Sequence, residues 1–152
     1  MFFNTIKNHR LLSAAFALGL AASAPGQSVI LPAPRLLTTL PMGGKVGTTF
    51  EITISGDDLD GITGMHFSHP GITAKPAAAK NKFSVTIAAN IPAGIYEARV
   101  MARLGVSSCR AFTVGTRSEV TQKKPNQSLA QAMEISLNSV CNAVMSVKAV
   151  DY

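Results

Sequence analysis

The stretch from Thr48 to Phe67 reads TTFEITISGDDLDGITGMHF and decides the fold. Its first half alternates, with Phe50, Ile52 and Ile54 on one side and polar residues on the other, which is the period-two pattern of a strand with one buried face. A loop rich in Asp and Gly comes next, and a second short strand places Met65 and Phe67 inward. The stretch therefore predicts two strands joined by a corner, as in a small β-sandwich.

The same alternation recurs on both sides of this stretch. Runs separated by turn signals, with Gly43-Gly44 counted among the turns, have the spacing typical of a sandwich or barrel. We expect strands near residues 35–40, 48–55, 62–68, 72–75, 82–89, 95–103 and 107–114. Seven strands in about 80–90 residues match one immunoglobulin-like β-sandwich, so the predicted fold class is all-β, with a partial second β domain at the C-terminus.

Residues 1–27 have the pattern of a signal peptide. Lys7 and Arg10 precede the apolar run Leu11–Ala22, and small residues come after it, which places cleavage within residues 24–28. The apolar run is shorter than the roughly 20 residues of a membrane span, which weighs against the alternative of an uncleaved anchor. The sequence therefore predicts an exported protein, periplasmic, cell-surface or extracellular, with no membrane span once the signal is removed.

The remaining chain divides into three predicted parts. Residues 28–115 form the immunoglobulin-like sandwich, and the polar residues 116–128 form a linker. Residues 129–152 are too few to bury a core and read as the incomplete start of a second β domain. We expect there a short helix (Leu129–Met133) or an extended segment, and then strands at Glu134–Leu137 and Val140–Val147.

The charge pattern argues against a nucleic-acid partner. The whole chain carries 14 basic and 8 acidic residues, a formal charge of +6. Removal of Lys7 and Arg10 with the leader leaves 12 basic residues and a charge of +4. These residues are scattered and the chain has no Trp, whereas nucleic-acid binding needs a clustered basic stripe with aromatic residues. No nucleic acid is expected as a partner.

Two cysteines, Cys109 and Cys141, remain after the leader. An oxidising compartment permits a disulfide, but the two lie in different predicted domains, which favours two unlinked, partly buried thiols. A catalytic cysteine is disfavoured because the sequence places no His beside either one.

The histidines and acids of the corner are the remaining candidates for chemistry. His66 and His69 lie three apart and would face opposite sides of a strand, so a zinc pair is disfavoured. Ser68 lies between them without a nucleophile elbow, and no phosphate-binding loop precedes a helix. The sequence therefore predicts no catalytic residue, no cofactor-binding residue and no cofactor.

Asp57, Asp58 and Asp60 put three carboxylates within four residues. The spacing lacks the closing Glu of an EF-hand, which favours a role in capping the turn, with Leu59 packed into the end of the sandwich. A weak calcium site at these three residues remains an open alternative. No other metal site is predicted.

Three segments resemble the IPT/TIG family of immunoglobulin-like domains, found in transcription factors, plexins and bacterial surface proteins. They are Gly56–Phe67 (GDDLDGITGMHF), Ile91–Val100 (IPAGIYEARV) and Cys109–Gly115 (CRAFTVG). The resemblance covers about Pro34 to Gly115 and implies a fold more than a function.

The C-terminal residues resemble the first quarter of the bacterial pre-peptidase C-terminal domain, a β-sandwich appended to secreted peptidases. Lys124-Pro125-Asn126 stands where family members usually have Glu-Pro-Asn, and Asn142-Ala143 where they often have Asn-Gly. An acidic residue at the first position matters in relatives that bind calcium, so Lys124 weighs against calcium here. Together the two resemblances imply the N-terminal part of a longer exported bacterial protein.

The sequence supports two functions from different classes. The first is a non-catalytic interaction or spacer module of a surface or secreted protein, with a protein or a cell-surface polymer as partner. The second is an accessory region of a secreted peptidase or other hydrolase whose catalytic part lies elsewhere. A carbohydrate-binding module is disfavoured because the chain has no Trp and no exposed aromatic row.

Overall fold

The computed structural model describes residues 31–145, 147 and 150–152. The predicted signal peptide and its cleavage site lie outside these residues. The strands of the described residues all belong to one compact unit, Pro32–Tyr152. No helix in the described part of the chain is long and apolar enough to cross a lipid bilayer.

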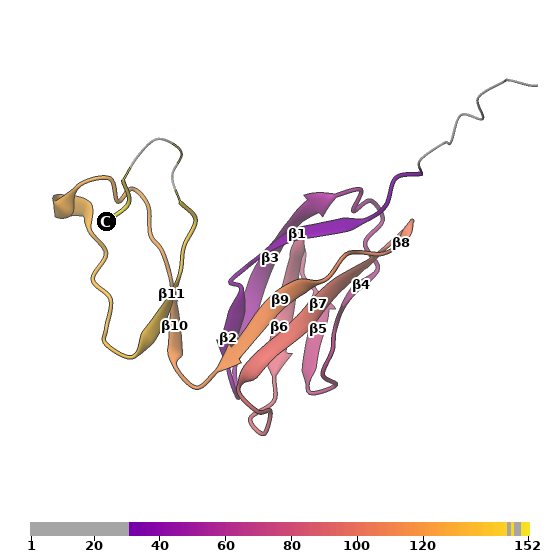
Figure 1. Cartoon of the computed structure of the whole chain (residues 1–152), viewed down its shortest axis with the longest axis horizontal. Coiled ribbons are helices and arrows are strands. Elements are labelled where there is room, and N and C mark those ends of the chain that lie inside the picture. The colour runs from indigo at the N-terminus through magenta and orange to yellow at the C-terminus, as the bar shows by residue number, and fades with distance from the viewer. Residues whose placement is uncertain (1–30, 146, 148–149) are drawn as a thin grey trace, which may run out of the picture. The chain divides into compact units, whose positions relative to one another are not determined.

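Two sheets form a sandwich (Figure 1). The first sheet has the order β1 (Arg35–Leu40), β3 (Thr49–Asp57), β6 (Lys82–Ile87) and β5 (Ile72–Pro76). The second has the order β2 (Gly43–Lys45), β9 (Arg110–Gly115), β7 (Gly94–Ala102) and β4 (Gly64–Phe67), with β8 (Gly105–Val106) also paired to β7. In these two sheets every pair is antiparallel except β2 with β9. This strand order is that of an immunoglobulin-like sandwich and confirms the predicted fold class.

Alternation along each strand builds the core. Ile52 and Ile54 of β3 and Phe83, Val85 and Ile87 of β6 point between the sheets, as predicted, because successive side chains of a strand face opposite sides. Among the described residues, the buried apolar set is Leu36, Ile52, Ile54, Met65, Phe67, Ile72, Phe83, Val85, Ile87, Ile91, Ala98, Val100, Phe112 and Val114. Every member lies between residues 36 and 114, so this core belongs to the sandwich alone.

The Gly43-Gly44 pair was predicted as a turn, and that prediction is wrong. These residues form β2, which runs parallel to β9 in the register Gly43↔Thr113 and Gly44↔Val114. A Cβ atom on Gly43 would overlap the carbonyl oxygen of Thr113, and one on Gly44 would overlap the ring of Phe50. The glycines are there for close packing, not for a bend.

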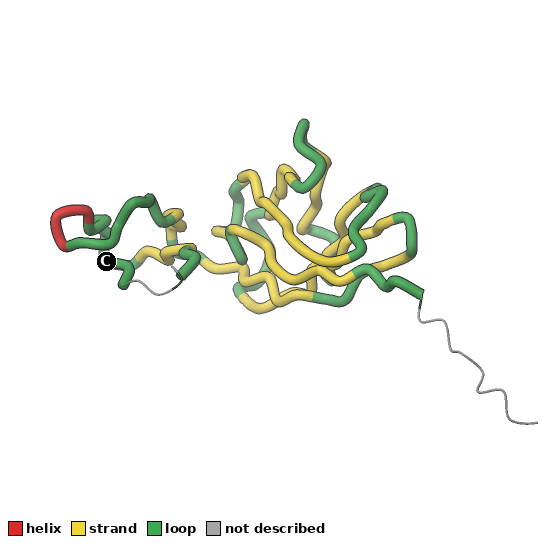
Figure 2. The backbone as a smooth tube through the Cα atoms, turned by 90° about the horizontal axis from the view of Figure 1, so that it is seen from above, coloured by secondary structure: helices red, strands yellow, loops and turns green. Residues whose placement is uncertain are grey.

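Residues after Gly115 form a separate two-stranded parallel sheet of β10 (Ser118–Thr121) and β11 (Ser139–Asn142). The region predicted as a linker thus contains a strand. The predicted helix is a single 3₁₀ turn, Leu129–Gln131, drawn red in Figure 2. The segment Glu134–Leu137, predicted as a strand, is not in a strand, and the next strand covers only the beginning of Val140–Val147. A short polar stretch such as Ser118–Thr121 has no periodic apolar signal, which is why the sequence did not reveal its pairing.

Candidate functional site

One end of the sandwich is formed by the three loops that come after β3, β5 and β7. They cover residues 58–63, 77–81 and 103–104. The backbone of Arg103 donates a hydrogen bond to the carbonyl of Asp60 (3.0 Å), which ties the third loop to the first. The carbonyl of Asn81 accepts from Ile54 N–H (2.8 Å), which anchors the second loop to the last residues of β3. We call this surface, residues 58–63, 77–81 and 103–104, the loop end.

The loop end is hollowed on both sides of Leu59. One cavity of about 290 Å³ and another of about 490 Å³ share Leu59, Asp60, Ile62 and Lys80 in their walls. Leu59 is half-buried and packs against the core, as predicted. The surface therefore combines an apolar floor with exposed charges of both signs.

The three acids predicted at this corner are all exposed. Asp57 ends β3 and lies 3.9 Å from the guanidinium of Arg35. Asp58 has a φ of 54°, the left-handed conformation that Asp tolerates in turns. Of the three acids, Asp58 and Asp60 line the larger cavity. In the described residues, no three His, Cys, Asp or Glu side chains gather as a metal site requires.

The corner histidines lie apart from these acids. His66 is exposed on β4 opposite Arg99, while Met65 and Phe67 are buried, as predicted. Beyond β4, His69 Nδ1 accepts a hydrogen bond from Gly71 N–H (3.1 Å), and Ser68 Oγ accepts one from Glu97 N–H (2.9 Å). The four residues of β4 span roughly 13 Å, so Ser68 and His69 lie at one end of that strand and the acids at the other. Ser68 and His69 are thus not brought together with the three acids.

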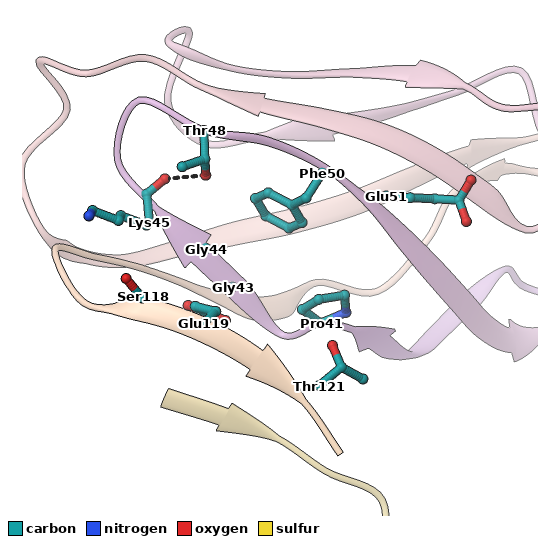
Figure 3. A pocket seen from close by; sticks show the side chains of 10 residues that line it. All are labelled: Pro41, Gly43, Gly44, Lys45, Thr48, Phe50, Glu51, Ser118, Glu119 and Thr121. Carbon is teal, nitrogen blue, oxygen red and sulfur yellow. Dashed lines mark hydrogen bonds between the residues drawn. The ribbon is translucent and has the colours of Figure 1, made fainter. Parts of the chain in front are cut away.

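A second hollow lies where the C-terminal segment meets the sandwich. It measures about 500 Å³ and is lined by Pro41, Gly43, Gly44, Lys45, Thr48, Phe50, Glu51, Ser118, Glu119 and Thr121. Figure 3 shows the Phe50 ring beside the two glycines and the side chains of β10 across from them. Glu51 is held by Lys82 (2.5 Å), and Thr48 Oγ1 donates to the carbonyl of Lys45 (2.6 Å, Figure 3). Sequence reasoning missed this hollow, because the strand pairing of residues 43–45 and 118–121 was not predicted.

A third cavity, of about 350 Å³, lies near the second and has Met42, Glu119, Cys141 and Asn142 among its lining residues. Both cysteines are free thiols. Cys141 is half-buried, as predicted, whereas Cys109 is exposed, because its position just before β9 lies outside the packed face. No sequence pattern predicts a structural role for the Asn142 side chain. Asn142 is 4% exposed, and both the oxygen and the nitrogen of its side-chain amide are hydrogen-bonded.

No protein-family model matches this chain, and no curated protein matches it. One solved structure with a similar arrangement is that of the Bacteroides ovatus mixed-linkage glucan utilization locus protein SGBP-B in complex with a mixed-linkage heptasaccharide. The similarity has 19% sequence identity and a TM-score of 0.36, and it covers 53% of this chain. The chain spans about a fifth (21%) of the length of that structure.

Proposed function

We propose that this protein is a non-catalytic, exported interaction module whose binding surface is the loop end of the sandwich. The observation that carries the proposal is the pair of cavities around Leu59, with exposed Asp58, Asp60 and Lys80 on their walls. Binding residues gather on loops held by a rigid scaffold, because loops can vary without disturbing the core. The loop end has that arrangement.

The surface chemistry supports a polar partner with apolar patches, such as a protein or a cell-surface polymer. The third loop adds Arg103, and next to it Met101, Leu104 and Val106 are exposed apolar residues of the β7–β8 hairpin. Charged residues around a modest apolar area are typical of non-obligate interfaces. The resemblance to IPT/TIG domains supports the same class of function.

Binding of the full chain to purified cell-wall polysaccharides, peptidoglycan and surface proteins of an exporting bacterium tests the proposal. The decisive variant combines Asp58→Ala, Lys80→Ala and Arg103→Ala. Its control combines Arg117→Ala, Lys123→Ala and Glu134→Ala, which also removes two cations and one anion from exposed positions outside the loop end. We expect the first variant to lose binding and the control to keep it. Equal binding by both would move the site away from the loop end, and binding to none of the probes would contradict the proposal.

The alternative is an accessory region of a secreted peptidase or other hydrolase. Its support is the resemblance of residues 124–152 to the start of a pre-peptidase C-terminal domain. Apolar side chains there, such as Leu137, Met145 and Val147, are exposed and fit a segment that packs against further protein. The reading frame beyond codon 152 distinguishes the two: a peptidase motif favours the alternative, and further sandwich repeats favour the interaction module.

A further inference from the structure

The side chain of Asn142 joins the C-terminal segment to the sandwich. Its Oδ1 accepts a hydrogen bond from the backbone N–H of Met42 (3.0 Å), and its Nδ2 donates one to Glu119 Oε2 (2.5 Å). Only 4% of Asn142 is exposed, and both hydrogen bonds are part-buried. Burial of an amide costs free energy unless its polar atoms are paired, and here both ends are paired.

Met42, the residue on the other side of this contact, is itself anchored. Met42 lies between β1 and β2, and its carbonyl accepts from Thr113 N–H of β9 (3.0 Å). The carbonyl of Met42 is therefore committed to the sandwich, and its N–H is committed to Asn142 of β11. A single residue thus connects both parts.

The C-terminal strands are placed to make this contact. Only Thr116 and Arg117 separate β9 from β10, so β10 leaves the sandwich directly beside β2. β11 is held on β10 by the parallel ladder, which Gln122 N–H extends by donating to the carbonyl of Asn142 (2.8 Å). The side-chain Oε1 of Gln122 then accepts from Val144 N–H (3.0 Å). These contacts fix Asn142 at the end of β11.

We propose that the edge of the sandwich formed by Met42 and β2 is a docking surface for β10–β11. The Asn142 side chain holds the segment there through its two hydrogen bonds, and we call this contact the clasp. β2 pairs with β9 on one side only, and a strand with a free edge is open to unwanted pairing. The docked segment lies against that edge, and residues of both parts line the hollow drawn in Figure 3 and the smaller cavity of about 350 Å³ near it. The clasp makes the sandwich and the segment one rigid unit, which fixes the direction in which the chain leaves the sandwich.

The clasp needs an amide for a chemical reason. The group at position 142 must accept from a backbone N–H and donate to a carboxylate at the same time, and the Asn amide has one acceptor and one donor group so placed. In Asn142→Asp the acceptor remains, but the donor becomes a second carboxylate oxygen facing Glu119, and like charges at this distance repel. A second change, Glu119→Gln, supplies a donor from the other side and restores the hydrogen bond with its polarity reversed.

Cys141, next to Asn142 and half-buried, reports whether the segment is docked. The full chain with Cys109→Ser is treated with a thiol reagent in native buffer, and the rate of Cys141 modification is divided by its rate in denaturant. This ratio corrects for any direct effect of a neighbouring charge on thiol reactivity. We expect Asn142→Ala and Asn142→Asp to raise the ratio about tenfold or more, since each leaves part-buried polar groups unpaired. Asn142→Asp with Glu119→Gln returns it to within about threefold of the parent.

Cys109 supplies the control for the sandwich. With Cys141→Ser in place of Cys109→Ser, the reactivity of the exposed Cys109 and the main melting transition stay unchanged in every variant if only docking is lost. Unchanged Cys141 protection in Asn142→Ala and Asn142→Asp overturns the clasp. Failure of Glu119→Gln to rescue Asn142→Asp also overturns it. The clasp is overturned as well if, in any variant, Cys141 becomes reactive only when the sandwich and the segment unfold together.

Discussion

At the scale of single residues, the packing of β2 depends on two glycines, Gly43 and Gly44, which have no Cβ atom. Gly44 lies under the ring of Phe50, and a Cβ atom there would also come within 2.9 Å of Ile87 Cδ1. Phe50 was predicted on the buried face of its strand with Ile52 and Ile54, and it is half-buried, with its ring beside β2 and the hollow there. A Gly-Gly pair in a sequence is typical of a turn, whereas here it marks the approach of a ring to a backbone.

We predict that Gly44→Ala destabilises the sandwich by about 1–3 kcal/mol, because an added methyl group in a packed site forces its neighbours to move. The free energy of unfolding from urea titrations measures this. Gly94→Ala is the matched control, since its Cβ would meet nothing closer than Tyr96 Cε2 at 4.0 Å. Equal costs for the two changes would show that the ring and the glycine are not in contact.

Ser107 is a second residue whose role the sequence did not indicate. It comes directly after β8, is 2% exposed, and its Oγ accepts from Val100 N–H (2.9 Å) while donating to the carbonyl of Ser108 (2.8 Å). Its backbone N–H also donates to the carbonyl of Val100 (2.9 Å). The hydroxyl thus satisfies a backbone donor of β7 beyond the end of the regular ladder to β9.

Replacing Ser107 by Ala should cost about 1–3 kcal/mol of unfolding free energy, because the buried N–H of Val100 loses its acceptor. Thermal or chemical denaturation measures the loss, and hydrogen exchange should show the Val100 amide exchanging faster. Ser55→Ala, which removes an exposed hydroxyl bonded to Thr38 Oγ1, is the control and should change stability by less than about 0.5 kcal/mol. A silent Ser107→Ala would mean that water or another group replaces the hydroxyl.

At the scale of elements, the loop after β3 determines which groups the three acids of the corner contact. Asp57 is engaged with Arg35, and the backbone carbonyl of Asp60 is engaged with Arg103. Asp58 and Asp60 line the hollow of the loop end, and the neighbouring loop contributes Lys80 and Asn81 there instead of a third carboxylate. This arrangement makes a poor calcium cage, since calcium takes six to eight oxygen ligands.

Calorimetric titration of the chelator-treated chain with calcium should therefore show no micromolar binding. Asp58→Ala and Asp60→Ala should leave the titration as it is in the parent. A micromolar isotherm that disappears in either variant would establish the loop as a calcium site, and the loop end would then be a calcium-dependent binding surface.

At the scale of the whole molecule, the sandwich holds a core to which the C-terminal segment adds no buried apolar residue among those described. The buried apolar set runs from Leu36 to Val114. The segment beyond residue 115 instead exposes Leu129, Leu137, Met145 and Val147. Folding free energy comes mainly from buried apolar area, so the sandwich should hold its structure without the segment.

Residues 28–115 alone are expected to give a β-type circular dichroism spectrum and a single cooperative melt. The midpoint should lie close to that of the main transition of the full chain, because the sandwich loses little more than the contact of Met42 N–H with Asn142. Several independent transitions, or a failure to melt cooperatively, would show that part of the folding energy resides beyond residue 115.

The sequence by itself determined the sandwich. Alternation in Phe50–Ile54 and Phe83–Ile87, and the inward parity of Met65 and Phe67, result from the two-residue repeat of a strand and are visible without neighbours. The same local signals located the corner acids, the exposed His66 and the half-buried Leu59. These features depend on residues close together in the chain.

Only the tertiary structure decided what depends on distant residues. The strand identity of Gly43-Gly44 arises from β9, about 70 residues further along, and that of Ser118–Thr121 from β11. The role of Asn142 depends on a backbone N–H of Met42, 100 positions earlier. Hydrogen bonds between strands and the close approach of a ring to a glycine leave no periodic mark in the sequence, because the energy that fixes them belongs to the pair of segments and to neither one alone.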